Sequence, residues 1–289
     1  MTEPKQRYAL DALLGVEGAV LPPGGHVLLN VVSILKQSPA AAQLMRLAGF
    51  HKTSSGFDAM LDAGTGYFYP RLNHFDVGYQ QPWVHKTEKG LCRTLAAFTA
   101  NLRRAWQHNL GCGADRNLAP EHFLMQHRCE EADTQAALHH VAWELKVAGA
   151  QFLWRHLSSG SNGDIAVVYA RAAEEDAQAS HDGRALRAAF DQWFAERERL
   201  NACDAQALEI LDLALLETPF APAPARPLQR LQMQALGLMP GGYNYLAGCL
   251  FAGPWYETRP ETAVLERMQD IEQDRTRLIA LAEKQPQHK

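Results

Sequence analysis

The sequence predicts a mainly α-helical fold with one short β-sheet, an α+β arrangement. Alanine and leucine dominate, and apolar residues recur over long stretches with the 3.6-residue period of a helix. One aromatic and β-favouring stretch between glycine turns, residues 67–79, predicts a hairpin or short sheet. With 289 residues, the chain is long enough for one large or two modest domains and a substantial core.

The first elements lie before and within the predicted sheet. Residues 27–36 are apolar enough to form either a buried helix or a strand. Ser38 and Pro39 are typical of a helix N-cap and first helical residue, opening a helix that runs to about Ala48. Within residues 67–79, Pro70 indicates an edge position or a bend, because proline cannot donate a hydrogen bond to a neighbouring strand.

Helices are expected over most of the remaining chain. One proline- and alanine-rich stretch, residues 218–227, is the best candidate for an extended linker. The expected domains are therefore a helical region at 1–63, a main domain at 64–217, the linker at 218–227 and a helical extension at 228–289. The expected helices span residues 89–109, 120–154 with a break near Arg128, 165–178, 183–199, 204–217 with Asp204 as N-cap, a short helix after the linker, and 261–284.

Composition excludes several classes of protein. Hydrophobic residues make up 47% of the chain and charged residues 21%, which is ordinary for a globular protein. The net charge of −4 gives no basis for nucleic-acid or membrane-surface binding, and no apolar run approaches the ~18 residues of a membrane span. The five cysteines are scattered without a C-x-x-C pair, which argues against disulfides and a cysteine zinc site. We expect a cytoplasmic protein without a secretory signal.

Two stretches of the chain carry a paired motif. Residues 95–107 read L-A-A-F-T-A-N-L-R-R-A-W-Q, and residues 130–133 read E-E-A-D. These stretches resemble an uncharacterised bacterial family of metallopeptidase-like domains, whose pattern is H-E-L-R-H-A-W-Q on one helix and E-A-D on the next. A third similarity covers residues 188–194 and the following Asp204, so the resemblance spans about residues 64–212. The pattern's Leu102, Arg103, Ala105, Trp106 and Gln107 are retained.

The resemblance implies a zincin-like minimal metallopeptidase domain, with a short sheet over an active-site helix and additional helices. It also implies zinc, held by the two histidines of H-E-x-x-H and by a third ligand at the position of Glu131. The chain departs from the pattern at all three reactive positions. Alanine offers no ligand atom, asparagine cannot take a proton from water, and arginine stays protonated. We therefore expect no catalytic residue, no zinc and no enzymatic activity, with Ala100, Asn101, Arg104 and Glu131 marking the former site.

If no zinc ion binds, the charge of the Glu131 carboxylate must be neutralised in another way. If Arg104 stands at the second histidine's position, its guanidinium can bind the carboxylate bidentately and offset the cost of burying it. The sequence leaves this ion pair open against an Arg104 that points into solvent while Glu131 pairs locally.

A replacement metal site is a second open question. His140 and Glu144 are four residues apart, and His127, Glu131 and His139 lie on the same predicted helix, so a polar cluster of His127, His139, His140 and Glu144 is possible. The alternative is an ordinary solvated helix face. The remaining candidates near the cleft show no ligand spacing: His74, His85 and His108.

The sequence favours a degenerate, inactive metallopeptidase-like protein that binds a peptide or protein. The strand before the helix would hold the partner by strand addition, as in related proteases. One alternative is a metal-dependent peptidase with a relocated site. Another is a structural subunit whose apolar segment, residues 245–255, packs on a neighbour or against its own main domain.

Overall fold

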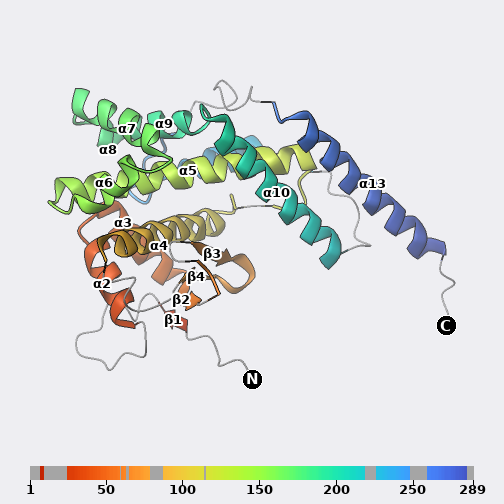
Figure 1. Cartoon of the computed structure of the whole chain (residues 1–289), viewed down its shortest axis with the longest axis horizontal. Coiled ribbons are helices and arrows are strands. Elements are labelled where there is room, and N and C mark those ends of the chain that lie inside the picture. The colour runs from red at the N-terminus through yellow and green to blue at the C-terminus, as the bar shows by residue number, and fades with distance from the viewer. Residues whose placement is uncertain are drawn as a thin grey trace.

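The computed structural model describes residues 7–9, 25–58, 60–62, 65–78, 87–113, 115–218, 226–247 and 259–284. These residues form a mainly helical protein with one small sheet, as the sequence predicts (Figure 1). Within these ranges, no helix combines the length and the apolar character that crossing a bilayer requires.

The sheet has four strands in the order β1-β2-β4-β3. Strands β3 and β4 form the antiparallel hairpin expected within residues 67–79, and β2 runs parallel to β4. Pro70 opens the 3₁₀ turn η1 (Pro70–Leu72) between β3 and β4, which confirms the predicted bend. Strand β3 lies at one edge of the sheet. The strands are β1 (Arg7–Ala9), β2 (Ser54–Asp58), β3 (Gly66–Tyr69) and β4 (His74–Gly78).

Two helices precede most of the sheet. Helix α2 (Gly25–Leu35) shows that the apolar stretch at residues 27–36 is helical. Helix α3 (Pro39–Phe50) begins as predicted, because the Ser38 hydroxyl accepts a hydrogen bond from the amide of Ala41 at 3.1 Å.

Helices α4 (Glu88–Asn109) and α5 (Pro120–Val147) form the centre of the molecule (Figure 1). The inner face of the sheet packs on α4, where the rings of Phe75 and Phe98 meet edge to face with centroids 5.1 Å apart. Helix α5 packs against α4 and runs without interruption through Arg128, so the predicted break there is wrong. The chain turns instead at Gly149, which has a positive φ of 98°.

The segment after α5 differs from the expected helices at two places. The helix expected at residues 183–199 is two helices, because Arg199 donates hydrogen bonds to the carbonyls of Gln192 and Trp193 where the first one ends. Asp204 is not an N-cap but lies buried inside the next helix. The helices are α6 (Phe152–Ser158), α7 (Gly163–Glu175), α8 (Ala179–Asp182), α9 (Arg184–Trp193) and α10 (Arg197–Glu217).

A buried ion pair between Arg128 and Asp204 explains why α5 has no break near Arg128 and why Asp204 is not an N-cap. Arg128 Nε and Nη2 each lie 2.6 Å from an Asp204 carboxylate oxygen, and both side chains are buried between α5 and α10. A charged residue inside a helix is therefore compatible with continuity when a partner on another helix neutralises it.

The last two described helices pack in different places. Helix α11 (Arg230–Leu236) and the loop after it pack into the main core, which joins residues from Leu28 to Leu246. Helix α13 (Thr262–Lys284) packs along α10 around a second, smaller apolar cluster, and this pair extends to one side (Figure 1). Most of the expected linker lies outside the described residues, as do residues 248–255 of the apolar segment and His85.

Candidate functional site

Helix α4 presents one continuous face toward α5 and strand β3. Residues 100, 104 and 108 belong to this face, because side chains four positions apart lie one above another on a helix. The register is fixed at the start of the helix, where the Thr87 hydroxyl accepts a hydrogen bond from the amide of Gly90 at 3.0 Å.

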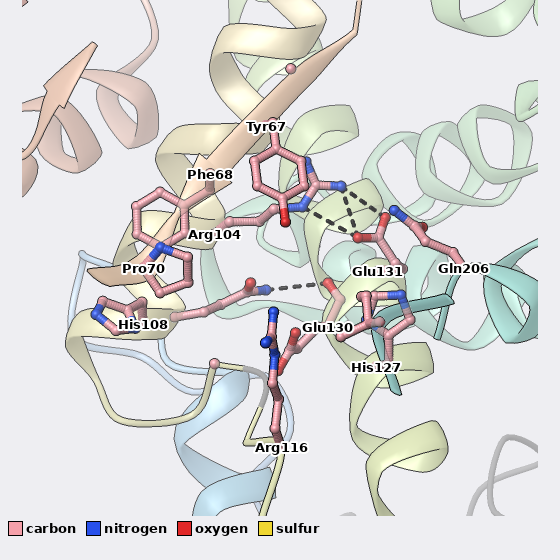
Figure 2. A pocket seen from close by; sticks show the side chains of 14 residues that line it. Tyr67, Phe68, Pro70, Arg104, His108, Arg116, His127, Glu130, Glu131 and Gln206 are labelled. Carbon is pink, nitrogen blue, oxygen red and sulfur yellow. Dashed lines mark hydrogen bonds and ion pairs between the residues drawn. The ribbon is translucent and has the colours of Figure 1, made fainter. Parts of the chain in front are cut away.

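Arg104 of α4 and Glu131 of α5 form a bidentate ion pair across the two helices (Figure 2). Arg104 Nη2 lies 2.8 Å from Glu131 Oε1 and 3.0 Å from Oε2, and Nε lies 3.3 Å from Oε1. The two side chains are only 28% and 17% exposed. Of the two alternatives that the sequence left open, the ion pair is the one that the structure shows, and an Arg104 pointing into solvent is wrong.

The ion pair sets the charge of both groups. Burial acts to raise the pKa of Glu131, but the charges of Arg104 and His127 and the hydrogen bonds from Arg104 bring this pKa below its ordinary value. Burial likewise acts to lower the pKa of Arg104, and the Glu131 carboxylate outweighs it, so the pKa of Arg104 is raised. Both groups are therefore charged at neutral pH.

Ala100 and Asn101 supply no reactive group. Ala100 is buried and ends in a methyl group. Asn101 is fully buried, and its Nδ2 donates to the carbonyl of Ala97 in the same helix at 2.8 Å. A side chain on Gly66 of β3 would collide with the Asn101 amide, so glycine at that position lets the strand lie directly on the helix.

A pocket of about 180 Å³ opens beside the ion pair, between β3, α4, α5 and α10 (Figure 2). Tyr67 and Phe68 of the edge strand cover one side of it, and the ring of His108 packs on Phe68 with centroids 5.5 Å apart. Its polar lining comprises Arg104, Gln107, His108, Arg116, His127, Glu130, Glu131 and Gln206.

Two of the lining side chains have buried polar atoms without a hydrogen-bond partner among the described residues. Glu130 is 8% exposed, and its Oε1 accepts no hydrogen bond. His127 is 6% exposed, and neither ring nitrogen makes a hydrogen bond of normal geometry, although the Gln206 side chain interacts with the ring. Burial raises the pKa of Glu130 well above its ordinary value and lowers the pKa of His127, so both favour their neutral forms.

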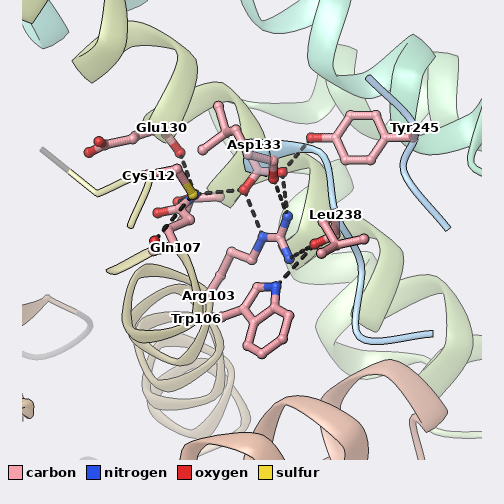
Figure 3. A network of polar contacts seen from close by, with 10 residues as sticks. Arg103, Trp106, Gln107, Cys112, Glu130, Asp133, Leu238 and Tyr245 are labelled. Atoms are coloured by element: carbon pink, nitrogen blue, oxygen red, sulfur yellow. Dashed lines mark hydrogen bonds and ion pairs between the residues drawn. The ribbon is translucent and has the colours of Figure 1, made fainter. Parts of the chain in front are cut away.

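Two of the retained motif residues, Arg103 and Gln107, bind a buried carboxylate, although Gln107 also lines the pocket. Arg103 is fully buried and forms a fork with Asp133, with Nε 2.7 Å from Oδ2 and Nη2 2.8 Å from Oδ1 (Figure 3). Gln107 Nε2 donates to Asp133 Oδ2 at 2.6 Å. Asp133 of the E-A-D stretch is therefore a structural anchor for the first helix, whereas Glu131 faces the pocket.

The same network of hydrogen bonds binds the end of α11 and the loop after it to helix α4. Arg103 donates to the carbonyls of Leu236 and Leu238 at 2.7 and 3.1 Å, and Trp106 Nε1 donates to the Leu238 carbonyl at 3.0 Å. The Tyr245 hydroxyl donates to Asp133 Oδ1 at 2.5 Å (Figure 3). Of the apolar segment at residues 245–255, the described part thus packs against its own main body.

The candidate polar cluster on α5 is divided between separate places. His140 Nδ1 lies 2.6 Å from the Tyr169 hydroxyl and Nε2 lies 3.4 Å from Glu144, whose other oxygen accepts from the amide of Ala40. His139 Nδ1 lies 2.8 Å from the carbonyl of Gln135. His127 is about 20 Å away along the helix axis, at 1.5 Å per residue. His127 and Glu131 share the pocket, and His139, His140 and Glu144 do not.

The donors around the ion pair do not fit zinc. Ala100 has no ligand atom, Arg104 carries a positive charge, and both oxygens of Glu131 are engaged by it. No group of three or more His, Cys, Asp or Glu side chains in the described ranges is arranged to hold a metal ion. The four described cysteines are buried free thiols.

Several pocket residues gave no signal in the sequence. Arg116 lies in the loop before α5, and Gln206 lies on α10, far from Glu131 in the chain. Glu130 stands next to Glu131, but two consecutive glutamates on a helix do not reveal which one is buried without a partner. Only the packing of α10 against α5 brings these residues together.

Comparison with known proteins gives one match. The family model described as "Putative metallopeptidase family (DUF6782)" matches residues 28–247. No curated protein and no solved structure matches the chain.

Proposed function

Because the chain belongs to the DUF6782 family, we propose that it is a metallopeptidase-like protein that binds a peptide or protein segment without cutting it. Its architecture in this proposal is zincin-like: a short sheet lies on helix α4, and helix α5 brings Glu131 to the same face. The position of the family's metal is taken by the guanidinium of Arg104.

The Arg104–Glu131 ion pair carries the proposal. In the family pattern, residues 100 and 104 would be the two histidine ligands, and residue 131 would supply the carboxylate. Here Arg104 Nη2 lies within 3.0 Å of both Glu131 oxygens. The guanidinium therefore neutralises the carboxylate that would bind the zinc ion in the family pattern. Without a metal-bound water and with Asn101 in the place of the general base, the site has no hydrolytic machinery of the family type.

Strand β3 supplies the binding surface in this proposal. The amide of Gly78 donates to the carbonyl of Thr65 at 2.9 Å, so residues 65 and 78 are a hydrogen-bonded pair of the antiparallel ladder. Pairs alternate along such a ladder, so the main-chain groups of Gly66 and Phe68 point to the outer edge. An extended peptide can add to β3 there, with its side chains over the pocket.

Metal content tests the loss of the zinc site. Purified full-length protein incubated with zinc and then desalted should retain no stoichiometric zinc by mass spectrometry. The matched variant Ala100→His/Asn101→Glu/Arg104→His restores the ligands and the base, and it should retain about one zinc per chain. One zinc per wild-type chain, lost in Glu131→Gln, would contradict the proposal.

Peptide binding is tested separately with a phage-displayed random peptide library. We expect selected peptides to bind the wild-type chain and to bring the Gly66 and Phe68 amides into slow hydrogen exchange. Selection of no binder, or of binders that leave these two amides unchanged, would reject strand addition at β3.

A further inference from the structure

Two buried side chains at the pocket beside the ion pair have polar atoms without a regular partner. Within the part of the chain that the structure describes, Glu130 Oε1 accepts no hydrogen bond, and neither ring nitrogen of His127 makes one of normal geometry. Both side chains line the pocket and are more than nine-tenths buried. Because an unpaired buried polar group is unfavourable, a ligand that hydrogen-bonds to both is favoured.

The arginines of the lining already have carboxylate partners. Arg104 binds Glu131 through Nε and Nη2. Arg116 Nη1 lies 2.8 Å from Glu217 Oε2. A carboxylate ligand would lie beside the two glutamates of the lining, and an ammonium ligand would lie beside its two arginines. The pocket therefore favours a ligand group without charge.

The two unpaired side chains require both donors and acceptors. A neutral imidazole has one N–H donor and one acceptor nitrogen, and a carboxyl oxygen accepts when ionised and belongs to a group that also donates when protonated. A primary amide has two N–H donors and an acceptor oxygen, so it can pair with His127 and with either form of Glu130. A hydroxyl group has only one donor and cannot donate to both side chains.

The opposite requirement comes from the apolar part of the lining. Tyr67, Phe68 and Pro70 contribute rings on the side of the edge strand, and Ile210 of α10 adds an aliphatic side chain. Methylene groups gain from contact with such a surface. An amide at the end of a short aliphatic side chain therefore matches both parts of the pocket.

We propose that this pocket binds the primary amide of a glutamine or asparagine side chain in a bound peptide. The amide hydrogen-bonds to Glu130 Oε1 and to the ring of His127, and the methylene groups of the same side chain lie against Tyr67 and Phe68. The inference rests on the proposed function in taking the carrier to be a peptide.

Five small probes test the amide site on the full-length chain. The Nα-acetyl N-methylamides of glutamine and asparagine carry one primary amide each, in the side chain. The corresponding derivatives of methionine, glutamate and lysine are the apolar, anionic and cationic counterparts. Binding is followed through the ring resonances of His127 and His108 in histidine-labelled protein, assigned with the variants His127→Gln and His108→Gln.

At least one amide probe should bind about tenfold more tightly than the methionine probe, the size of one net hydrogen bond. The same probe should also bind more tightly than the glutamate and lysine probes. Equal affinity for the methionine probe, tighter binding of either charged probe, or no shift with either amide probe would overturn the inference.

Two glutamate variants on α5 provide a matched control. Glu130→Leu keeps a side chain of similar size and removes the acceptor, so it should weaken the better amide probe about tenfold. Glu121→Leu replaces an exposed glutamate outside the lining and should leave the affinity unchanged. Equal effects of the two variants would contradict a direct contact with Glu130.

A ring substitution tests His127 without changing the shape of the pocket. The His127 ring stacks on Phe123 with centroids 6.1 Å apart, and His127→Phe keeps a ring there while removing both nitrogens. This variant should weaken the better amide probe about tenfold and leave the methionine probe unchanged, as read from His108. Equal weakening of both probes would show that His127 contributes only its shape.

The two proposals can fail independently. The probes are too short to form a strand, so their binding does not depend on the edge of β3. A preference for the amide probes without any selected peptide would reject the peptide-binding role and keep the amide site. Selected peptides that add to β3 but keep their affinity when each glutamine and asparagine is replaced by methionine would reject the amide site alone.

Discussion

Two adjacent arginines on α4 have different roles because a helix turns 100° per residue. Arg103 faces the interior, where Asp133 and two carbonyls surround it, and it is fully buried. Arg104 faces the pocket and pairs with Glu131. On α5 the same rotation separates Glu131 from Asp133. The two adjacent arginines thus divide between a buried network that joins α4 to α5 and the ion pair that lines the pocket.

The ion pair at the pocket predicts a coupled effect on stability. Arg104→Gln should lower the free energy of unfolding by about 2 kcal/mol, because Glu131 is left half-buried without its cation. The double variant Arg104→Gln/Glu131→Gln should recover part of this loss, since no charge is then left unpaired. Urea denaturation of the wild type, both single variants and the double variant gives the coupling energy. Strictly additive losses would show that the two side chains do not stabilise each other.

At the scale of elements, the contact between β3 and α4 defines the site. Gly66 has no side chain, so the strand lies directly on Asn101. The outer edge of β3 is left beside the pocket because η1 turns the chain back into β4 rather than into another strand on that side.

Hydrogen exchange should show the alternation along β3. The amides of Tyr67 and Tyr69 belong to hydrogen-bonded pairs with Asp76 and His74, so they should exchange slowly. The amides of Gly66 and Phe68 point outward and should exchange at least about tenfold faster. Amide-resolved exchange by NMR measures this difference in the free protein. Equal protection of all four amides would mean that the edge is already covered.

At the scale of the whole molecule, one buried network joins segments far apart in the chain. Asp133 accepts hydrogen bonds from Arg103, Gln107 and Tyr245. Arg103 also donates to the carbonyl at the end of α11 and to that of Leu238 in the loop after it. The main core accordingly contains residues from α2 to this loop, and the match to the family model covers nearly the same range.

Asp133→Asn should therefore destabilise the protein by about 3–5 kcal/mol, since it leaves Arg103 buried without a counter-charge. Proteases should also cut residues 228–247 more readily in this variant. The control is Asp212→Asn, which removes a bidentate partner from Arg267 on the exposed α10–α13 pair. This control should unfold at the wild-type urea concentration. Equal losses in the two variants would argue against a special role for the buried network.

Much of the site could be predicted from the sequence where local pattern determines it. The helix expected at residues 89–109 follows from its periodicity, and the resemblance makes the pairing of Arg104 with Glu131 one of two alternatives, which the structure then decides. The misplaced break at Arg128 and the misplaced cap at Asp204 share one cause. The local sequence favours a helix break at Arg128 and an N-cap at Asp204. Neither forms, because the two side chains make a buried ion pair between positions 76 residues apart.

By itself, the sequence determined the mainly helical fold, a short sheet or hairpin at residues 67–79 and the resemblance to the family, and it left the Arg104–Glu131 ion pair as one of two alternatives. These follow from short-range periodicity, turn chemistry and the motif spacing on two helices. Only the tertiary structure decided which polar residues meet. It separated His127 from His140, brought Glu130, Arg116 and Gln206 into one pocket, and joined Tyr245 to Asp133. The reason is physical: burial and pairing depend on contacts between distant segments, which local pattern does not specify.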